Sequence, residues 1–593
     1  MMNNTTQELL PTAWSLEDLL ATPLEDSMDA LLADLDGSIT SFEVNRELLS
    51  DTIGHDEFRS ILRQYEHILE LGYRAYAYAH LFFFSDVKNQ AALILRDRVD
   101  QAVTAADNRT LFFTLWLKSL TPEIVTRLAP EGDNRHYLNN LLKFKPYTLG
   151  ESEEQIINLK DTNGINAIVS LYDMITNGFT FTVEVEGERR TLTRDQVSAL
   201  YRHPSPDVRA AAYQELFRVY EDNSAVLAQM YSHRVRDWHS ESLLLRHYPT
   251  AISARNLAND IPDNVVDVLL GVCADNNDLF QRYFKLKAGW LGVKRLRRYD
   301  IYSPLTTADK TFEYAQALDL IMDSLRHFSP AVADMAWRIV TDNHIDAEIR
   351  PGKRGGAFCY SVLPGMTPWV HVNFTGKARD VATLAHELGH GIHGILSANH
   401  SLLTYHPSLP LAETASVFSE MLLTERLLSQ ETDVAVRRDL LAYAVDDAYA
   451  TVQRQSYFTL FEREAHDLIM AGKSADDLCV AYLKNLQTQF GEAVDLSDDF
   501  RWEWISIPHI YHTPFYTYAY SFGQLLVLSL YSQYRVDGES FIPRYLNLLS
   551  YGGAEEPAKV LNEAGFDIAA PSFWQGGYDV LRDMIDELEN LHA

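Results

Sequence analysis

The chain has 593 residues, of which 47% are hydrophobic and 22% are charged, a composition that fills a large core and excludes disordered and fibrous classes. The formal net charge of −31 repels phosphate backbones, so nucleic acid is not an expected partner. Cys273, Cys359 and Cys479 are odd in number and far apart, so we expect a reducing compartment, without a disulfide framework or a thiolate metal site.

The start of the chain shows no targeting signal. Residues 1–7 contain neither a basic segment nor an apolar one, so they do not resemble a signal peptide. A run of about 18 apolar residues, which a membrane-spanning helix needs, does not occur in the sequence. We therefore expect a cytoplasmic protein that binds no membrane. Its oligomeric state stays open.

Helical periodicity dominates the first part of the chain. Residues 15–50 carry leucines at helical spacing, and residues 55–145 are aromatic and helix-like with almost no strand signal. This succession of helices predicts a mainly α protein. Residues 179–185 alternate at period 2, and the return after Glu186-Gly187 predicts a β-hairpin.

A helix start follows the hairpin, with Ser205 as N-cap and Pro206 at the first helical position. We place a boundary near residue 200. It separates an N-terminal helical domain over residues 1–200 from a catalytic region over residues 201–593.

A second pair of strands is predicted between residues 357 and 374. Residues 358–363 precede a turn at Pro364-Gly365, and residues 369–374 alternate cleanly at period 2. We expect a small sheet here, directly before the helix that carries the most informative motif. After residue 430 the pattern returns to helices, and the last one is predicted from Tyr578 to Asn590.

His386, Glu387 and His390 form an HExxH motif. Two imidazoles at positions i and i+4 lie one turn apart on the same helix face, so both can reach one Zn²⁺. Glu387 lies beside them, where it can accept a proton from a zinc-activated water. An apolar stripe through Leu384 and Leu388 lies behind the histidine stripe, as a helix that presents ligands requires. A surface helix with two chance histidines is the alternative.

Two further features of this helix narrow the class of site. Gly389 in the helix interior predicts close packing against another element. The metzincin pattern would need Gly and His at the positions that His393 and Leu396 occupy, so that class is excluded. We expect His393, which shares the ligand face, to be structural or to support a ligand.

A third ligand must then come from a second helix. Glu413, at the start of an amphipathic stretch after Pro410, is the natural candidate, and with two histidines it leaves one coordination position open. Glu420 shares its helix face, and we expect it to orient a ligand imidazole. His400 and His406 lie in the connecting loop and are not expected to be ligands.

Residues 502–522 are dense in aromatic side chains and histidines. Ordinary aromatic packing explains most of them. However, peptide hydrolysis builds negative charge on the carbonyl oxygen, which a Tyr hydroxyl or a His N–H can stabilise. His509, Tyr516 and Tyr520 are the candidates for this role.

Together these motifs resemble peptidase family M3, the zinc metallopeptidases that include thimet oligopeptidase and neurolysin. The resemblance rests on the HExxH motif, on Glu413-x-x-Ser416 and on the segment from His509 to Tyr520. Residues 355–359 and 508–520 look most like the oligoendopeptidase F branch. The similar region covers about residues 200–590.

The resemblance implies a mainly α, neurolysin-like ellipsoid with a deep narrow channel and a small β-sheet beside the zinc helix. Such a channel admits short unfolded oligopeptides, whose internal bonds are cleaved, and residues 357–363 would bind peptide backbone as an added strand. One zinc ion per chain is implied, and no other cofactor. The implied site comprises the ligands His386, His390 and Glu413, the base Glu387, and the oxyanion donors His509 and Tyr520, with Tyr516 as the alternative tyrosine.

Two other functions remain open from the sequence. One is a different zinc peptidase with the same ligand set, an aminopeptidase or a carboxypeptidase. An aminopeptidase would need an anchor for the substrate's amino terminus, typically a GxMEN-like motif, and none is present. The other is a helical peptide-binding protein without catalysis.

Overall fold

The computed structural model describes residues 10, 12–21, 24–305 and 311–592. Residues 1–7, for which the sequence predicts no signal peptide, lie outside the described residues. Two compact units form, each from three separate segments. Unit 1 comprises the described parts of Met1–Pro146, Asp309–Gln430 and Gln533–Phe566, and unit 2 those of Tyr147–Ala308, Glu431–Ser532 and Asp567–Ala593. The boundary expected near residue 200 does not coincide with this division and stays a prediction.

Helices dominate both units, so the protein is mainly α, as the periodicity predicts. The helices of unit 1 are α1 (Leu24–Glu43), α2 (His55–Ser85), α3 (Gln90–Ser119), α4 (Pro122–Leu128), α5 (Asp133–Phe144), α14 (Tyr314–Phe328), α15 (Pro330–Thr341), α16 (Ala378–Leu396), α17 (Leu409–Ala412), α18 (Thr414–Gln430), α24 (Phe541–Ser550) and α25 (Pro557–Glu563). Those of unit 2 are α6 (Glu151–Asn163), α7 (Ile165–Asn177), α8 (Arg194–Ala199), α9 (Pro206–Asp222), α10 (Ser224–His239), α11 (Ser253–Ala258), α12 (Asp263–Asp275), α13 (Asn277–Trp290), α19 (Val434–Ala448), α20 (Arg454–Met470), α21 (Ala475–Phe490), α22 (Pro508–His512) and α26 (Pro571–His592). Helix α23 (Tyr518–Asp537) begins in unit 2 and ends in unit 1.

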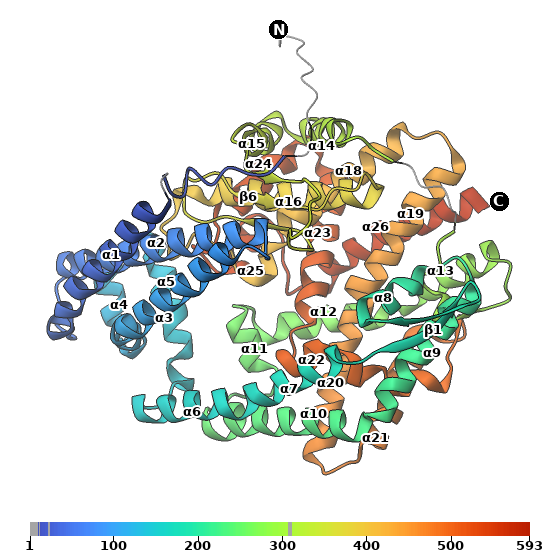
Figure 1. The fold of residues 1–593 in the computed structure, drawn as a ribbon, viewed down its shortest axis with the longest axis horizontal. Coiled ribbons are helices and arrows are strands. Elements are labelled where there is room, and N and C mark those ends of the chain that lie inside the picture. Colours follow the sequence, from blue (N-terminus) through green and yellow to red (C-terminus); the bar gives the residue numbers. More distant parts are fainter. Residues whose placement is uncertain (1–9, 11, 22–23, 306–310, 593) are drawn as a thin grey trace, which may run out of the picture. The chain divides into compact units, whose positions relative to one another are not determined.

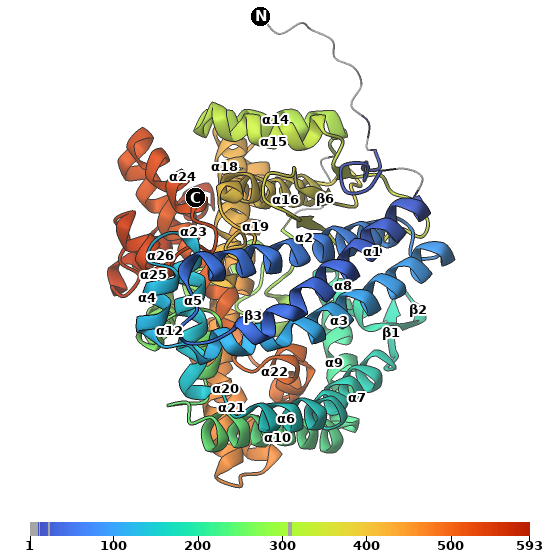
Figure 2. The same ribbon diagram turned by 90° about the vertical axis from the view of Figure 1, so that its left-hand side faces the viewer.

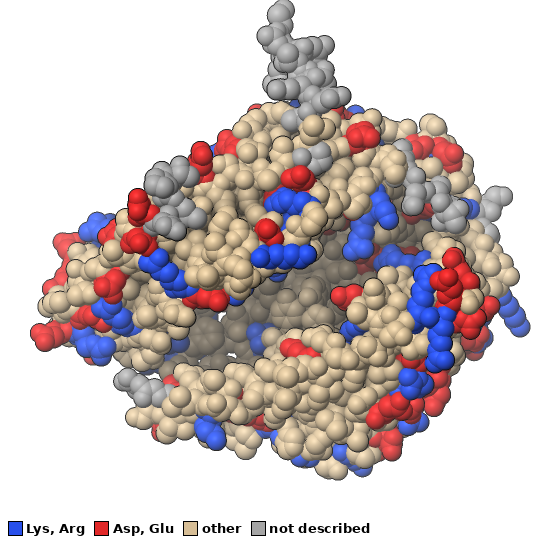
Figure 3. Space-filling model, viewed as in Figure 1, with Lys and Arg blue, Asp and Glu red and all other residues tan. Residues whose placement is uncertain are grey.

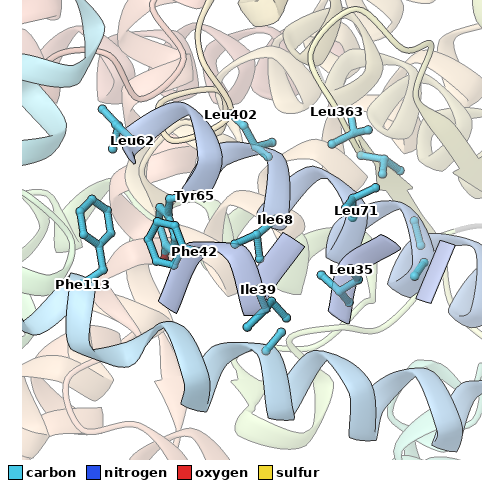
Figure 4. Close-up of a cluster of buried hydrophobic side chains, with 14 of the residues drawn as sticks. Leu35, Ile39, Phe42, Leu62, Tyr65, Ile68, Leu71, Phe113, Leu363 and Leu402 are labelled. Atoms are coloured by element: carbon cyan, nitrogen blue, oxygen red, sulfur yellow. The ribbon is translucent and has the colours of Figure 1, made fainter. Parts of the chain in front are cut away.

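The N-terminal helices build the core that supports the rest of unit 1. Helices α1, α2 and α3 lie side by side in both ribbon views (Figures 1 and 2). Leu35, Ile39 and Phe42 are spaced i, i+4 and i+7, so they lie on one face of α1 and meet buried residues of α2 and α3 (Figure 4). Leu363 and Leu402 join the same cluster from the loops on either side of α16. Each such aliphatic side chain stabilises the fold by about 1.5–3 kcal/mol on full burial.

The described residues form three small sheets. In unit 2, β1 (Phe181–Val185) pairs antiparallel with β2 (Glu188–Leu192), which confirms the predicted hairpin. Glu186 and Gly187 at its turn both have positive φ, as a tight two-residue hairpin turn requires. Also in unit 2, β3 (Leu296–Arg297) pairs parallel with β7 (Val494–Asp495), a contact too short to leave a sequence pattern.

The third sheet lies beside α16 in unit 1, with the strand order β4-β6-β5. The predicted pairing of β5 (Phe358–Tyr360) with β6 (Trp369–His371) is confirmed, although both strands are shorter than expected. The sequence did not predict β4 (Ile345–Asp346), which pairs parallel with β6. Every residue of β6 is buried, and the Trp369 indole N–H donates to the backbone oxygen of Ser15 at 2.8 Å. β5 is an edge strand of the sheet that the described residues form.

Charged side chains and cysteines are distributed as follows in the described part of the chain. Acidic and basic side chains are interspersed over the face shown in Figure 3, and some pair closely, as Arg282 does with Glu589 at 2.6 Å. No disulfide joins the cysteines, all of which lie in the described part of the chain. Among the described helices, none has both the length and the apolar character to cross a membrane.

Candidate active site

The histidines of the HExxH motif stand on α16, which packs tightly against α18. Leu384 and Leu388 are fully buried on the other side of the helix, as the predicted apolar stripe requires. A Cβ atom on Gly389 would lie 2.5 Å from the backbone oxygen of Ala415 and 2.5 Å from the Cα of Ser416. Only glycine allows this approach, because backbone atoms cannot move aside as a flexible side chain can. The predicted close packing at Gly389 is confirmed.

Three donor groups converge where the two helices meet. The Nε2 atoms of His386 and His390 lie 3.3 and 3.5 Å from Oε2 of Glu413. Ligands at about 2.1 Å from a tetrahedral zinc ion are about 3.4 Å apart, so the spacing of these donors fits one such ion. The Ser416 hydroxyl donates to the same Glu413 oxygen at 2.8 Å, which fixes the carboxylate.

Glu413 lies at a junction rather than inside one helix. The sequence predicts Glu413 at the start of a second helix, but α17 ends at Ala412 and α18 begins at Thr414. Glu413 itself has φ −84° and ψ −2°, which interrupts the regular helix at that residue. Pro410, near the start of α17, begins this short turn.

Glu420 contacts the other nitrogen of a candidate ligand. Its Oε1 lies 2.5 Å from Nδ1 of His386, so the imidazole is held between two carboxylates. Burial opposes a charged imidazole, but the hydrogen bonds with Glu413 and Glu420 raise the pKa of His386 to about 10. The negative charge of the two carboxylates, which favours a proton on His386, would also favour a metal cation bound there in place of the proton.

The remaining two ligand candidates are in the protonation states that metal binding needs. Burial lowers the pKa of His390 to about 4, so its imidazole is neutral at pH 7. Burial acts to raise the pKa of Glu413, but His386, His390 and Ser416 outweigh it and lower that pKa to about 2. A neutral imidazole and an ionised carboxylate are the forms that bind metals.

Glu387 is suited to accept a proton. Its side chain is only 5% exposed, and burial raises its pKa to about 7. A general base is most effective when its pKa lies near the working pH. Its Oε2 has no hydrogen-bond partner among the described residues.

A cavity of about 520 Å³ opens beside these groups. It is lined by the three ligand candidates, by Glu387 and by β5, whose edge position leaves backbone groups available to an added strand. Tyr405 and His406 also line it. The sequence placed His406 in a loop as a residue not expected to be a ligand, and it did not indicate Tyr405, because the loop has no periodicity. His393 lines the cavity too, and burial lowers its pKa to about 3. His400 instead pairs with Asp133 at 2.8 Å.

The aromatic candidates gather in unit 2. His509 lies on α22, Tyr520 in the first turn of α23, and Tyr516 in the segment between them. The His509 ring is stacked with Tyr516 at 6.1 Å and perpendicular to Tyr520 at 5.7 Å. The Tyr520 hydroxyl lies 3.5 Å from Nε2 of His509. Burial lowers the pKa of His509, which favours a neutral ring at pH 7.

Comparison with known proteins identifies the family of this chain. The family described as Peptidase family M3 matches residues 199–580, and one described as Oligopeptidase F matches residues 128–181. Oligopeptidase PepF of Bacillus subtilis is 24% identical over 589 residues, covering 98% of this chain and 87% of the relative. The chromosomal oligoendopeptidase F of Lactococcus lactis subsp. cremoris is 28% identical over 426 residues, covering 71% of this chain and 70% of the relative.

Solved structures share the fold. A protein from Chlamydophila abortus has a TM-score of 0.88 at 23% identity, with 98% of both chains covered. The oligoendopeptidase-F of Enterococcus faecium has a TM-score of 0.70 at 22% identity, covering 95% of this chain and 98% of the other. The expected mainly α fold with small sheets is confirmed. Because the family match spans more than half of the sequence, this chain belongs to peptidase family M3, with oligoendopeptidase F among its relatives, and is a metalloendopeptidase.

Proposed function

We propose that this protein is a zinc-dependent oligoendopeptidase that hydrolyses internal bonds of short, unfolded peptides. The convergence of His386, His390 and Glu413, with buried Glu387 beside them in one cavity, carries the proposal. Two imidazoles and one carboxylate suit Zn²⁺ and leave one coordination position open, and the ligand set holds one ion per chain.

A zinc ion held by these residues would supply Lewis-acid chemistry, acidifying water and polarising the scissile carbonyl. Glu387 takes a proton from the attacking water while the water oxygen forms a bond to the carbonyl carbon. Glu387 then delivers that proton to the amine nitrogen when the C–N bond breaks. Glu420 holds the His386 ring by Nδ1 and so keeps Nε2 directed at Glu413.

We assign the substrate backbone to the edge strand β5. An extended peptide pairs with an edge strand through main-chain hydrogen bonds, which recognise any sequence. The wall that β5 forms in the cavity thus accounts for binding of unfolded peptides.

We assign oxyanion stabilisation to His509 and Tyr520, with Tyr516 as the alternative tyrosine. The resemblance to family M3 and the mutual contact of the three rings support this role. The hydroxyl of Tyr520 and a ring N–H of His509 are donors suited to a developing negative charge.

The test is cleavage of a quenched fluorescent peptide blocked at both ends. We expect internal cleavage that a chelator abolishes and added zinc restores. Glu413→Gln should lose bound zinc, whereas Glu425→Gln, at an exposed position on α18, should keep it. Cleavage of unblocked peptides only would favour an aminopeptidase or a carboxypeptidase, and peptide binding without cleavage would favour a non-catalytic protein.

The cytoplasmic location and the absence of a nucleic-acid partner rest on composition and stay predictions. Cell fractionation tests the location, and a gel-shift assay tests binding of nucleic acid.

A further inference from the structure

The segment that carries the proposed oxyanion donors contains a strained turn. The backbone N–H of Tyr516 donates to the oxygen of Thr513 at 3.1 Å, and Phe515 between them has φ 58°. Pro514 fixes a negative φ at the preceding position, which makes this a turn of type II. Turns of type II usually have Gly or Asn at the position that Phe515 occupies, because a bulky side chain is strained at positive φ. Strain of this kind is concentrated at functional sites.

Glu462 on α20 holds this turn from outside the segment. Its Oε1 accepts the backbone N–H of Phe515 at 3.0 Å, and its side chain is 0% exposed. The backbone N–H groups of Thr513 and Tyr516 donate to backbone carbonyls of the segment itself, and Pro514 has no N–H. The N–H of the strained residue thus depends on a side chain 53 positions away.

Three residues on one face of α20 contact the turn or the residue that follows it. Thr459, Glu462 and His466 are spaced i, i+3 and i+7, and all three are buried. The Thr459 hydroxyl lies 2.8 Å from the hydroxyl of Thr517. The His466 ring lies 4.5 Å from the ring of Phe515. The helix therefore fixes both the backbone and the side chain of the strained residue.

Glu462 accepts this hydrogen bond in a site that opposes its ionisation. Burial raises the pKa of Glu462 to about 8, although the Phe515 N–H, Arg255 and Arg234 act to lower it. Arg234 and Arg255 donate from Nε to backbone oxygens of Tyr511 and Pro514 in the same segment. Burying a carboxyl costs free energy unless it is hydrogen-bonded, and this one bonds to the turn.

We propose that Glu462 is a positioning residue for the peptidase reaction. By binding the backbone N–H of Phe515, Glu462 fixes the turn that sets Tyr516 and Tyr520 against His509. Tyr516 follows the strained residue directly, and its ring lies 6.1 Å from His509 and 5.2 Å from Tyr520. The inference rests on the proposed function, because it needs these rings to act on the substrate.

The experiment compares Glu462→Gln, Glu462→Ala and the exposed control Glu464→Ala in the full-length, zinc-loaded enzyme. Gln keeps an oxygen for the Phe515 N–H, so Glu462→Gln should stay within about threefold of the wild-type kcat. Glu462→Ala should lower kcat by about 10–100-fold with little change in KM, because small displacements of catalytic groups are costly. Hydrogen exchange over residues 508–520 should become faster in Glu462→Ala alone.

A double variant provides the coupling test. Tyr520→Phe should add less to the kcat loss in the Glu462→Ala background than in the wild type, since both changes affect one group. A purely structural role for Glu462 would lower the melting temperature and leave kcat per folded, zinc-loaded molecule unchanged.

Three results would overturn the proposal. The first is wild-type kcat in Glu462→Ala, and the second is equal impairment of the Gln and Ala variants. In both cases, losses in Tyr520→Phe and His509→Ala would leave the proposed function standing. The third is full kcat in Tyr520→Phe and His509→Ala themselves, which would remove the proposed oxyanion role and the positioning role with it.

Discussion

The region around the candidate metal ligands and the region around the aromatic candidates are built in different ways. Around His386 and Glu413, regular helices meet at a glycine, and the donor groups follow from helical spacing and close packing. Around Phe515, a strained turn is held by buried side chains of a distant helix. The first arrangement can be recognised in the sequence because its geometry is local. The second depends on tertiary contacts, so the sequence indicates the residue types but not what holds them.

The largest expected effect concerns the proton acceptor in the first region. Glu387→Gln should lower kcat by about 10²–10⁴-fold, because an amide cannot take a proton from water. Zinc content and the melting temperature should stay at wild-type values, and Glu425→Gln serves as the control. Steady-state kinetics with metal analysis measure both. Turnover retained in Glu387→Gln would remove Glu387 from the mechanism.

The second effect distinguishes the tyrosines of the other region. Tyr520→Phe should lower kcat by about 10²–10³-fold, the usual cost of losing one oxyanion donor, with KM nearly unchanged. Tyr516→Phe, which removes a hydroxyl from the same aromatic cluster, should have a clearly smaller effect. The reverse order would transfer the role to Tyr516.

The third prediction tests whether close packing builds the ligand set. Gly389→Ala should weaken zinc binding and destabilise the protein by about 1–3 kcal/mol, because the new Cβ pushes the backbone of α18 away. Gly72→Ala in α2, where a Cβ would meet nothing within 4 Å, should be neutral or stabilising by up to about 1 kcal/mol. Chelator competition and thermal unfolding measure the two effects. Normal zinc affinity in Gly389→Ala would contradict the packing argument.

The smallest effect concerns acid stability of the sheet beside α16. Burial lowers the pKa of His371 from 6.5 to about 4, so the folded state binds fewer protons than the unfolded state between these values. Stability should therefore be complete above pH 6.5 and should fall as the pH decreases towards 4. This histidine alone accounts for about 2 kcal/mol between pH 6.5 and 5.

His371→Gln removes this titration and can still donate to the backbone oxygen of Arg354, the partner of the histidine ring. Urea unfolding at pH 7 and pH 5 measures the difference. The midpoint of the variant should depend less on pH than that of the wild type. An identical pH dependence in both proteins would contradict the lowered pKa of His371 in the folded state.

Periodic features were predictable from the sequence. The HExxH helix, the hairpin at Glu186-Gly187 and the pairing of β5 with β6 all repeat a pattern over several residues. Glu413 was identified by elimination and chemistry rather than by its conformation, and the helix break at that residue was missed.

Features without a repeated pattern were not predictable. Strand β4 has two residues, too few to show a period. Tyr405 and His406 reach the cavity from a loop, and Glu462 bonds to the turn across 53 positions. The two units combine separate segments of the chain, which no local signal can encode.

The most direct test of the central claim is diffraction from crystals of the zinc-loaded protein, recorded at the zinc absorption edge. The account predicts one anomalous peak within about 2.0–2.2 Å of His386, His390 and Glu413. Asp161 on α6, Asp237 on α10 and Glu241 just after α10 form another group of close donor atoms and serve as an internal comparison. A peak at that acidic group, or no peak at the HExxH helix, would contradict the proposed zinc site.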